Sequence, residues 1–291
     1  MRDVLFHVMD NVSLQIDCLE GELTPSGQGQ TISLDDKNSF TLEMQNATTS
    51  ISSADLTALV NGFILPRAKT PLKNLQLTFN PDQSISVKGD LRKLIDVPIS
   101  ARATVRVTAD GNMRMHLSDM TVAGVIHQDA LDLLGLKIST LAQPKRKASF
   151  QIVGNDIIFP IDQMFPPPRV SGHLQMVSIS GDQMHLAFDP DPSQTAAEKS
   201  GTGNATNPPT PSRKYIYFRG GTMEFGLLTM SPVNMELVPL KTDTQKFFQF
   251  SVDQYFGQLV AGYSKSLPSK GLLVYMADER DLKQASPAKQ K

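Results

Sequence analysis

The sequence is poor in cysteine and tryptophan: its 291 residues contain one cysteine, Cys18, and no tryptophan. A single thiol excludes an intrachain disulfide framework and a zinc site built from cysteines. No charge dominates either, since 28 basic and 29 acidic residues give a formal net charge of −1. We therefore do not expect binding of nucleic acid through phosphate neutralisation. A hydrophobic content of 40% is typical of a globular protein with a substantial core.

Long apolar runs and common catalytic motifs are missing as well. No segment is apolar enough to span a bilayer, and the first ten residues lack the pattern of a signal peptide. Two explanations stay open, a cytoplasmic protein or the mature or truncated chain of an exported one. The sequence has no phosphate-binding loop, no nucleophile elbow and no His-Glu-x-x-His motif. Its five histidines are scattered, so we expect no catalytic residues, metal or other cofactor.

Composition also divides the chain. The segment 190–212 contains no Leu, Ile, Val, Met or aromatic residue, which predicts a flexible linker. Residues 1–189 form the predicted body of curved sheet and helices. Residues 213–280 are expected to add strands and a helix that complete the same domain, because they offer too small a core alone. Residues 281–291 are polar and predict a disordered tail.

Alternation of apolar and polar residues predicts most of the secondary structure. The clearest run is 97–108, which the turn sequence Ala109-Asp110-Gly111-Asn112 connects to a second run at 113–117. Together they predict a β-hairpin, and 75–79 with 85–87 predicts another. Such alternation is typical of antiparallel sheets with one buried face. Further strands are predicted at Leu14–Cys18, Phe40–Met44, Phe150–Ile152, Ile157–Ile161, Leu174–Ile179 and Met184–Phe188.

Three segments have helical periodicity, so the predicted class is α+β and rich in β. Ser53 is expected to cap the first helix, which Pro66 should end. Its apolar face consists of Leu56, Leu59, Val60, Phe63 and Ile64. A second helix is predicted around 128–141, and a third should begin after Ser251. The apolar face of the third consists of Val252, Tyr255, Phe256, Leu259, Val260 and Tyr263.

The apolar residues include 13 methionines and 14 phenylalanines. Methionine fills irregular space and is common where a surface accepts varied apolar ligands. A strongly curved sheet around a helix can enclose more apolar lining than packing requires, and an apolar ligand would bind there. The alternative is an ordinary core that uses methionine.

Several segments resemble a known family. They are SADLTALVNGFIL at 53–65, TPLKNLQLTF at 70–79, SVKGDLRKLIDVPISARATVRVTADGNMRMHL at 86–117 and HQDALDLLGLKISTL at 127–141. Their order resembles the LmeA-like phospholipid-binding proteins of bacteria, which are tied to the tubular lipid-binding (TULIP) superfamily. Tyr217-Phe218-Arg219-Gly220-Gly221-Thr222 is similar to the C-terminal part of a poorly characterised subgroup. The resemblance implies a highly curved antiparallel sheet wrapped around amphipathic helices, a groove for acyl chains, and a place at the cell envelope or periplasm.

The function predicted from these patterns is non-enzymatic binding of phospholipid or another long-chain apolar ligand, with peripheral membrane contact and a role in envelope lipid transport or maintenance. The residues expected to line the apolar groove are Leu56, Leu59, Val60 and Phe63 of the first helix, Val105, Val107, Met113, Met115 and Leu117 of the hairpin, and Tyr255, Phe256 and Leu259 at the other end. Two alternatives stay open. One is a structural module with a filled core that docks a protein partner through a sheet edge or the third helix. The other is an enzyme with a dispersed polar site.

Overall fold

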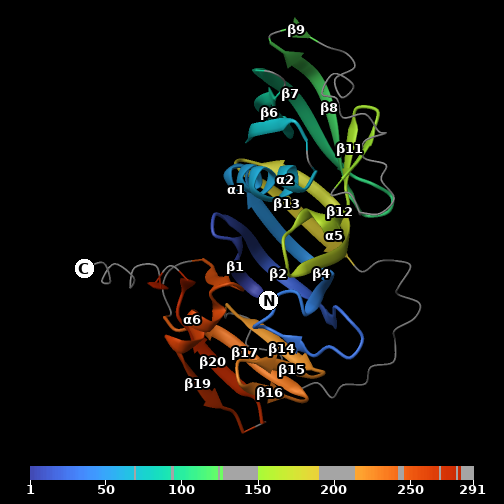
Figure 1. Ribbon diagram of the computed structural model, residues 1–291. Coiled ribbons are helices and arrows are strands. Elements are labelled where there is room, and N and C mark those ends of the chain that lie inside the picture. Colours follow the sequence, from blue (N-terminus) through green and yellow to red (C-terminus); the bar gives the residue numbers. More distant parts are fainter. Residues whose placement is uncertain are drawn as a thin grey trace. The chain divides into compact units, whose positions relative to one another are not determined.

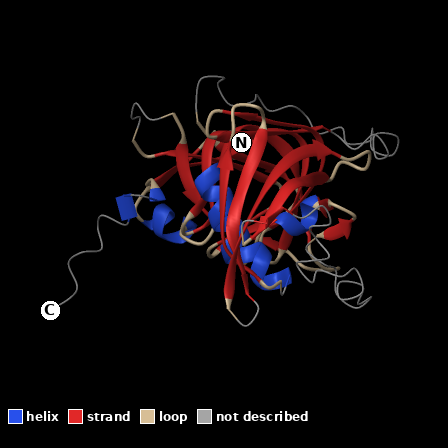
Figure 2. Cartoon of the chain, turned by 90° about the horizontal axis from the view of Figure 1, so that it is seen from above, coloured by secondary structure: helices blue, strands red, loops and turns tan. Residues whose placement is uncertain are grey.

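The structure is a computed structural model that describes residues 1–68, 70–92, 95–123, 125–126, 150–189, 214–241, 246–268, 270–279 and 281–282. The predicted helix around 128–141, the predicted linker at 190–212 and most of the predicted tail at 281–291 lie outside the described residues. Strands make up most of the ribbon, with short helices between them (Figures 1 and 2). The β-rich α+β class predicted from the alternation is therefore confirmed.

The chain forms two compact units. The first contains Met1–Thr49, Pro167–Arg169 and the described part of Pro190–Lys291, and the second contains Ser50–Pro166 and Val170–Asp189. This division differs from the predicted body at residues 1–189, because the N-terminal strands group with the C-terminal strands. The pairing of segments far apart in the sequence is the physical reason for the difference, as the strands of the first unit show.

The first unit is built mainly of strands. They are β1 (Arg2–Met9), β2 (Val12–Pro25), β3 (Ile32–Ser33), most of β4 (Phe40–Ser52), β14 (Ile216–Gly220), β15 (Met223–Phe225), β16 (Leu228–Met230), β17 (Val233–Pro239), β18 (Phe248–Ser251), β19 (Tyr263–Ser266) and β20 (Leu272–Met276). Within one sheet, β2 lies between β4 and β1, and β18 follows β1. The others form a sheet of order β14-β17-β20-β19 and a small sheet of order β16-β15-β3.

Three strand pairs in this unit are parallel, which local alternation does not reveal. Val4 of β1 lies opposite Phe248 of β18. The pairs β17–β20 and β15–β3 are parallel as well. Phe248 is fully buried. The C-terminal strands thus complete a core with β1 and β2, because the apolar faces of these strands cannot be buried separately.

The third predicted helix is shorter than its apolar pattern. Helix α6 covers Tyr255–Val260, and Tyr263, which was expected on its apolar face, opens β19. Gly262 lies where the chain turns, so close to the backbone of β20 that a Cβ there would be 1.8 Å from the carbonyl oxygen of Tyr275. A residue without a Cβ is therefore required at this close approach, two residues after the helix ends. Gln258 of α6 is fully buried, and its side-chain amide bonds the backbone of Ser251, Gln249 and Ala277.

The second unit is a sheet with helices and a further hairpin. Its strands are β5 (Leu72–Phe79), β6 (Ser84–Arg92), β7 (Asp96–Val107), β8 (Met113–Val122), β9 (Val125–Ile126), β10 (Gln151–Val153), β11 (Asp156–Phe159), β12 (Arg169–Ser180, all but its first residue) and β13 (Gln183–Asp189). The sheet order is β10-β11-β8-β7-β6-β5, with β9 beside β8, and within the described residues its strand pairs are antiparallel. Both predicted hairpins, β5–β6 and β7–β8, are therefore confirmed.

The first predicted helix is a composite of three segments. They are α1 (Ser53–Leu59), a π-helical turn η1 (Val60–Ile64) and α2 (Leu65–Ala68). The prediction that Ser53 caps it is wrong, because Ser52 Oγ accepts the bond from the Asp55 N–H, while Ser53 bonds Asp182. The prediction that Pro66 ends it is also wrong. The helical backbone passes from the π-turn through Pro66 and continues to Ala68.

The predicted strand at Ile157–Ile161 is two residues too long at its C-terminal end. It ends at Phe159, and Ile161 begins the short helix α5 (Ile161–Met164) after Pro160. Proline donates no ladder hydrogen bond, so the strand ends before it. The core of this unit lies between the sheet and α1, where Leu59, Ile85, Leu91 and Ala103 are buried.

Candidate functional site

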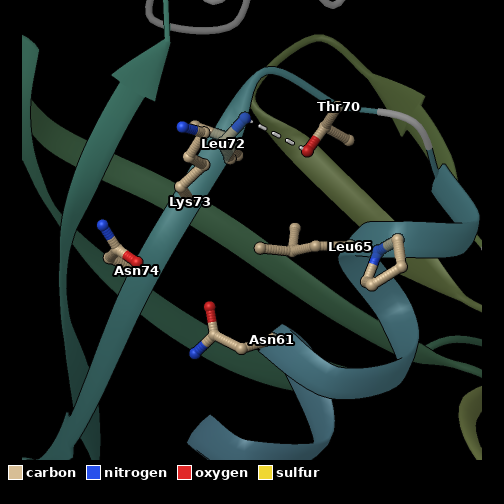
Figure 3. Close-up of a pocket in the computed structure, with 7 residues that line it drawn as sticks. Asn61, Leu65, Thr70, Leu72, Lys73 and Asn74 are labelled. Atoms are coloured by element: carbon tan, nitrogen blue, oxygen red, sulfur yellow. Dashed lines mark hydrogen bonds between the residues drawn. The ribbon is translucent and has the colours of Figure 1, made fainter. Parts of the chain in front are cut away.

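A hollow of about 570 Å³ lies in the second unit between the composite helix and β5. This volume is within the range of small-molecule sites, about 300–1,000 Å³. Its lining, drawn in Figure 3, consists of Asn61, Leu65 and Pro66 from the helix and Thr70, Leu72, Lys73 and Asn74 from the strand side. The hollow therefore combines an apolar part with amides and one cation.

Side chains of the helix cover part of the edge of β5. Among the described strands it is the last of its sheet, so one side of its backbone faces none of them. Asn61 Oδ1 accepts from the Leu75 N–H at 3.0 Å, and Asn61 Nδ2 donates to the Leu75 carbonyl at 2.7 Å. One turn earlier, Thr57 Oγ1 accepts from the Leu77 N–H at 3.0 Å. These contacts hold the helix against the strand edge.

The hollow opens where this cover stops. Thr57 and Asn61 are four residues apart on the helix, and the next position at this spacing is Leu65. The Leu65 side chain has no hydrogen-bonding group and points toward the strand (Figure 3). On the strand, Asn74 has a φ of 51°, and the β5–β6 register shifts between Lys73 and Gln76. A change of residue type on the helix and a bulge on the strand thus create the space together.

Lys73 supplies the positive charge of the lining. Its Nζ lies 3.7 Å from Asp96 Oδ1, and the two side chains are 34% and 52% exposed. Exposed pairs at such separations are weak, typically about 0–1 kcal/mol. The ammonium group is therefore available to a stronger anionic partner such as a phosphate or carboxylate.

An exposed apolar residue lies at the same end of the sheet. The Arg92 N–H donates to the Pro71 carbonyl at 2.8 Å, which places the end of β6 beside the start of β5. Three residues further along the chain, before β7 begins, Ile95 is 74% exposed. The end of the sheet near the hollow thus presents an isoleucine to solvent within a short segment that contains Arg92.

A second, smaller hollow of about 240 Å³ lies on the polar face of β7 and β8, lined by Thr104, Arg106, Arg114 and His116. Arg114 and His116 both bond Asp156, the histidine through Nδ1 at 2.8 Å. The hydrogen bond from Arg114, helped by His116, lowers the pKa of Asp156 below its ordinary value. The part of the chain that the structure describes contains no group of three or more His, Cys, Asp or Glu side chains placed to hold a metal.

The twelve residues predicted to line an apolar groove lie in both units. Those of the first helix and the hairpin belong to the second unit, whereas Tyr255, Phe256 and Leu259 belong to the first. Register brings Val105 opposite Met115 and Val107 opposite Met113. Five of the twelve are buried, namely Leu56, Leu59, Met113, Leu117 and Tyr255. Val60, Phe63, Val105, Val107, Met115 and Leu259 are half-buried, and Phe256 is 56% exposed.

None of these twelve residues belongs to the lining of the two hollows just described. Sequence reasoning missed Leu65, Leu72 and Lys73, because they are brought together only by the packing of the helix on β5. One clue was Asn61, a polar residue between the predicted apolar positions Val60 and Phe63. The role of the twelve residues in contacting a ligand stays a prediction.

Comparison with protein-family models, with curated proteins and with solved structures found no match. Within the described residues, no helix has both the length and the apolar character needed to cross a membrane.

Proposed function

We propose that the chain is a non-enzymatic binding protein for a lipid with an anionic head group and a long acyl chain. The observation that carries this proposal is the position of Lys73 beside Leu65 and Leu72 in the hollow of about 570 Å³. An anionic lipid has the same two parts, a charged group and an apolar chain. The lysine would bind the head group as a point charge, and the leucines would contact the first methylenes.

The energetics of apolar burial favour this ligand class. Each buried methylene contributes about 0.8 kcal/mol, so a chain of a dozen carbons offers useful affinity even after ordering costs. The neighbouring Ile95 would insert into the interfacial region of a membrane, with Arg92 near anionic lipid head groups. A contact of this kind would bring the hollow to its ligand.

The proposal includes the finer arrangement that the family resemblance implies. A highly curved sheet would wrap around the composite helix, and the acyl chain would continue from the hollow along the predicted apolar residues of the second unit. Leu59 and Met115 are the positions where a charge would block this path. The protein would then carry or maintain lipids of the cell envelope rather than catalyse a reaction.

Native mass spectrometry with organic extraction tests the proposal directly. We expect a bound mass that yields acyl lipids, and tighter binding to phosphatidylglycerol vesicles than to phosphatidylcholine vesicles. An empty protein that binds neither kind of vesicle would contradict the proposal. It would favour the alternative of a structural module with a filled core.

A pair of lysine variants locates the site. Lys73→Gln should weaken binding to phosphatidylglycerol vesicles, because it removes the cation of the hollow without changing the apolar lining. Lys88→Gln is the matched control, since Lys88 is exposed on the neighbouring strand β6 and does not line the hollow. Equal losses in the two variants would show that general surface charge, rather than this hollow, determines binding.

A further inference from the structure

The start of β1 lies between two strands of the first unit. Arg2 is in register with Cys18 of β2 on one side. On the other side it exchanges two backbone hydrogen bonds with Tyr215, at 2.9 and 3.1 Å. Both neighbours run antiparallel to β1. Figure 1 shows the N-terminus next to β2 and β14.

Both neighbouring strands continue past the point where β1 begins. After Leu19, whose N–H donates to the Met1 carbonyl at 3.0 Å, β2 runs on to Pro25. After Tyr215, β14 runs through Ile216–Gly220. Because both are antiparallel to β1, the two continuations run in the same direction, one on each side of the line that β1 would follow if it were extended backwards.

The facing edges of these continuations have no strand between them in the described part of the chain. Among the described strands, β14 is an end strand and pairs with β17. Beyond Leu19, the described strand that still neighbours β2 in this sheet is β4, since β1 has ended. Backbone N–H and C=O groups along an open edge are ready to pair with another strand.

A cleft of about 500 Å³ occupies this position. The lining includes Leu19–Leu23 of β2 and Tyr215–Thr222 around β14, and Met1 closes one end. Ile32, Leu42 and Met223 contribute apolar side chains, while Glu22 and Arg219 are exposed at the two edges. The cleft thus has two backbone edges and an apolar floor, which are the parts that recognise an extended peptide.

We propose that this cleft, the strand slot, binds an extended segment of a partner protein as an added β-strand. The segment would lie as a continuation of β1, antiparallel to both β2 and β14, and would match the five residues of β14. Its alternate side chains would be apolar, to contact Leu19 and Met223, with a basic residue toward Glu22. This inference concerns the first unit and is independent of lipid binding by the second.

Amide hydrogen exchange with two peptides tests the slot. The probe is the acetylated, amidated peptide Val-Lys-Val-Thr-Val-Lys, and its control carries N-methyl groups on alternate residues, which keep the side chains and remove the hydrogen bonds. We expect the probe to slow exchange of those amides in 20–23 and 216–220 that face the slot by about tenfold or more, as local pairing does. No protection, or equal protection by both peptides, would overturn the proposal; the second result would indicate an apolar ligand instead.

A covalent version removes dependence on peptide affinity. The same six residues fused before Met1 should fill the slot from within, protect the same amides and abolish protection by added probe. A fusion with prolines at alternate positions is the control. In the unfused protein, slot amides could become more protected as the protein concentration rises, together with a dimer mass. That result would overturn the proposal of a partner protein and would indicate that a second copy of the chain binds in the slot.

Discussion

Asn61 and Leu75 exchange two hydrogen bonds, at 2.7 and 3.0 Å, in the way that paired residues of neighbouring strands do. The helix thereby covers the open edge of β5 with a side chain instead of a strand. Covered edges are protected from pairing with other chains. In the first unit, by contrast, the facing edges of β2 and β14 have no such cover in the described residues. The two units therefore treat their sheet edges differently.

Replacing Asn61 tests the cover on β5. Asn61→Ala leaves the N–H and C=O of the buried Leu75 without partners, so it should lower the free energy of unfolding by about 1–3 kcal/mol. Asn61→Asp keeps the acceptor for the N–H and should lose less. Urea unfolding measures both, with Asn38→Ala in an exposed loop as the control. A loss for Asn61→Ala no larger than that of the control would contradict the structural role.

Ile95 is predicted to act in membrane contact and not in stability. Because its side chain is 74% exposed, Ile95→Asp should change the free energy of unfolding little while it weakens binding to phosphatidylglycerol vesicles. Val153→Asp is the matched control, since Val153 is 57% exposed on β10 of the same unit. Vesicle flotation measures the binding. Unchanged binding of the Ile95 variant would remove this residue from the proposed membrane contact.

The hairpins were predictable, whereas the pairing of distant segments was not. The hairpin of β7 and β8 is specified by alternation over consecutive residues and by the turn at Gly111, and both features lie within one short stretch of sequence. The parallel pair Val4–Phe248 joins residues at opposite ends of the chain, and no local pattern encodes its register. The same holds for the hollow near Lys73, which depends on where Leu65 lies relative to β5.

The composite helix shows a different limit of prediction from sequence. A π-turn at Val60–Ile64 keeps an apolar face much like that of a regular helix, so periodicity alone did not reveal it. Pro66 predicted the end of the helix, but the helical backbone continues from the π-turn past this proline to Ala68. Local propensities thus predicted the position of this helix, but they predicted its end at the wrong residue.

Gly262 is predicted to be intolerant of even a small side chain. Gly262→Ala would place a Cβ at 1.8 Å from the Tyr275 carbonyl oxygen, so the backbone of β20 or of the turn must shift. We expect a loss of about 1–3 kcal/mol or more, in the range of overpacked sites. Gly27→Ala is the control, since the nearest atoms belong to the flexible side chain of Gln30. Thermal unfolding compares the variants, and equal midpoints would contradict the close approach.

The ion pair on the polar face of the hairpin predicts a pH dependence. Arg114 lowers the pKa of Asp156 in the folded protein, so the pair stabilises the fold above the ordinary aspartate pKa of 3.8. That contribution is lost as the pH falls from this value through the lowered folded pKa. Asp156→Asn should therefore be less stable than the parent at neutral pH, with the gap closing in acid and in high salt. A gap that is independent of pH would exclude this cause.

Tyr255 links α6 to the loop that contains Asp35, and it offers the clearest titration test. Its hydroxyl donates to the Asp35 carboxylate, whose other oxygen accepts from the Gly226 N–H at 2.9 Å. Burial and the neighbouring carboxylate raise the pKa of Tyr255 above the ordinary value of 10.0. The stabilisation is thus fully present below that pH and is lost as the pH rises above it, because the unfolded chain ionises first.

Two variants separate the hydrogen bond from the ring. Tyr255→Phe keeps the contact with the Phe225 ring, 5.6 Å between centroids, and should lose about 1.5–3 kcal/mol, the value of a hydrogen bond to a charged group. Asp35→Asn keeps an acceptor and should lose less, while it brings the pKa of Tyr255 closer to its ordinary value. The ultraviolet absorbance of tyrosinate follows the titration. If Tyr255→Phe removed a group that ionises near the ordinary tyrosine pKa of 10.0, the carboxylate contact would not exist in solution.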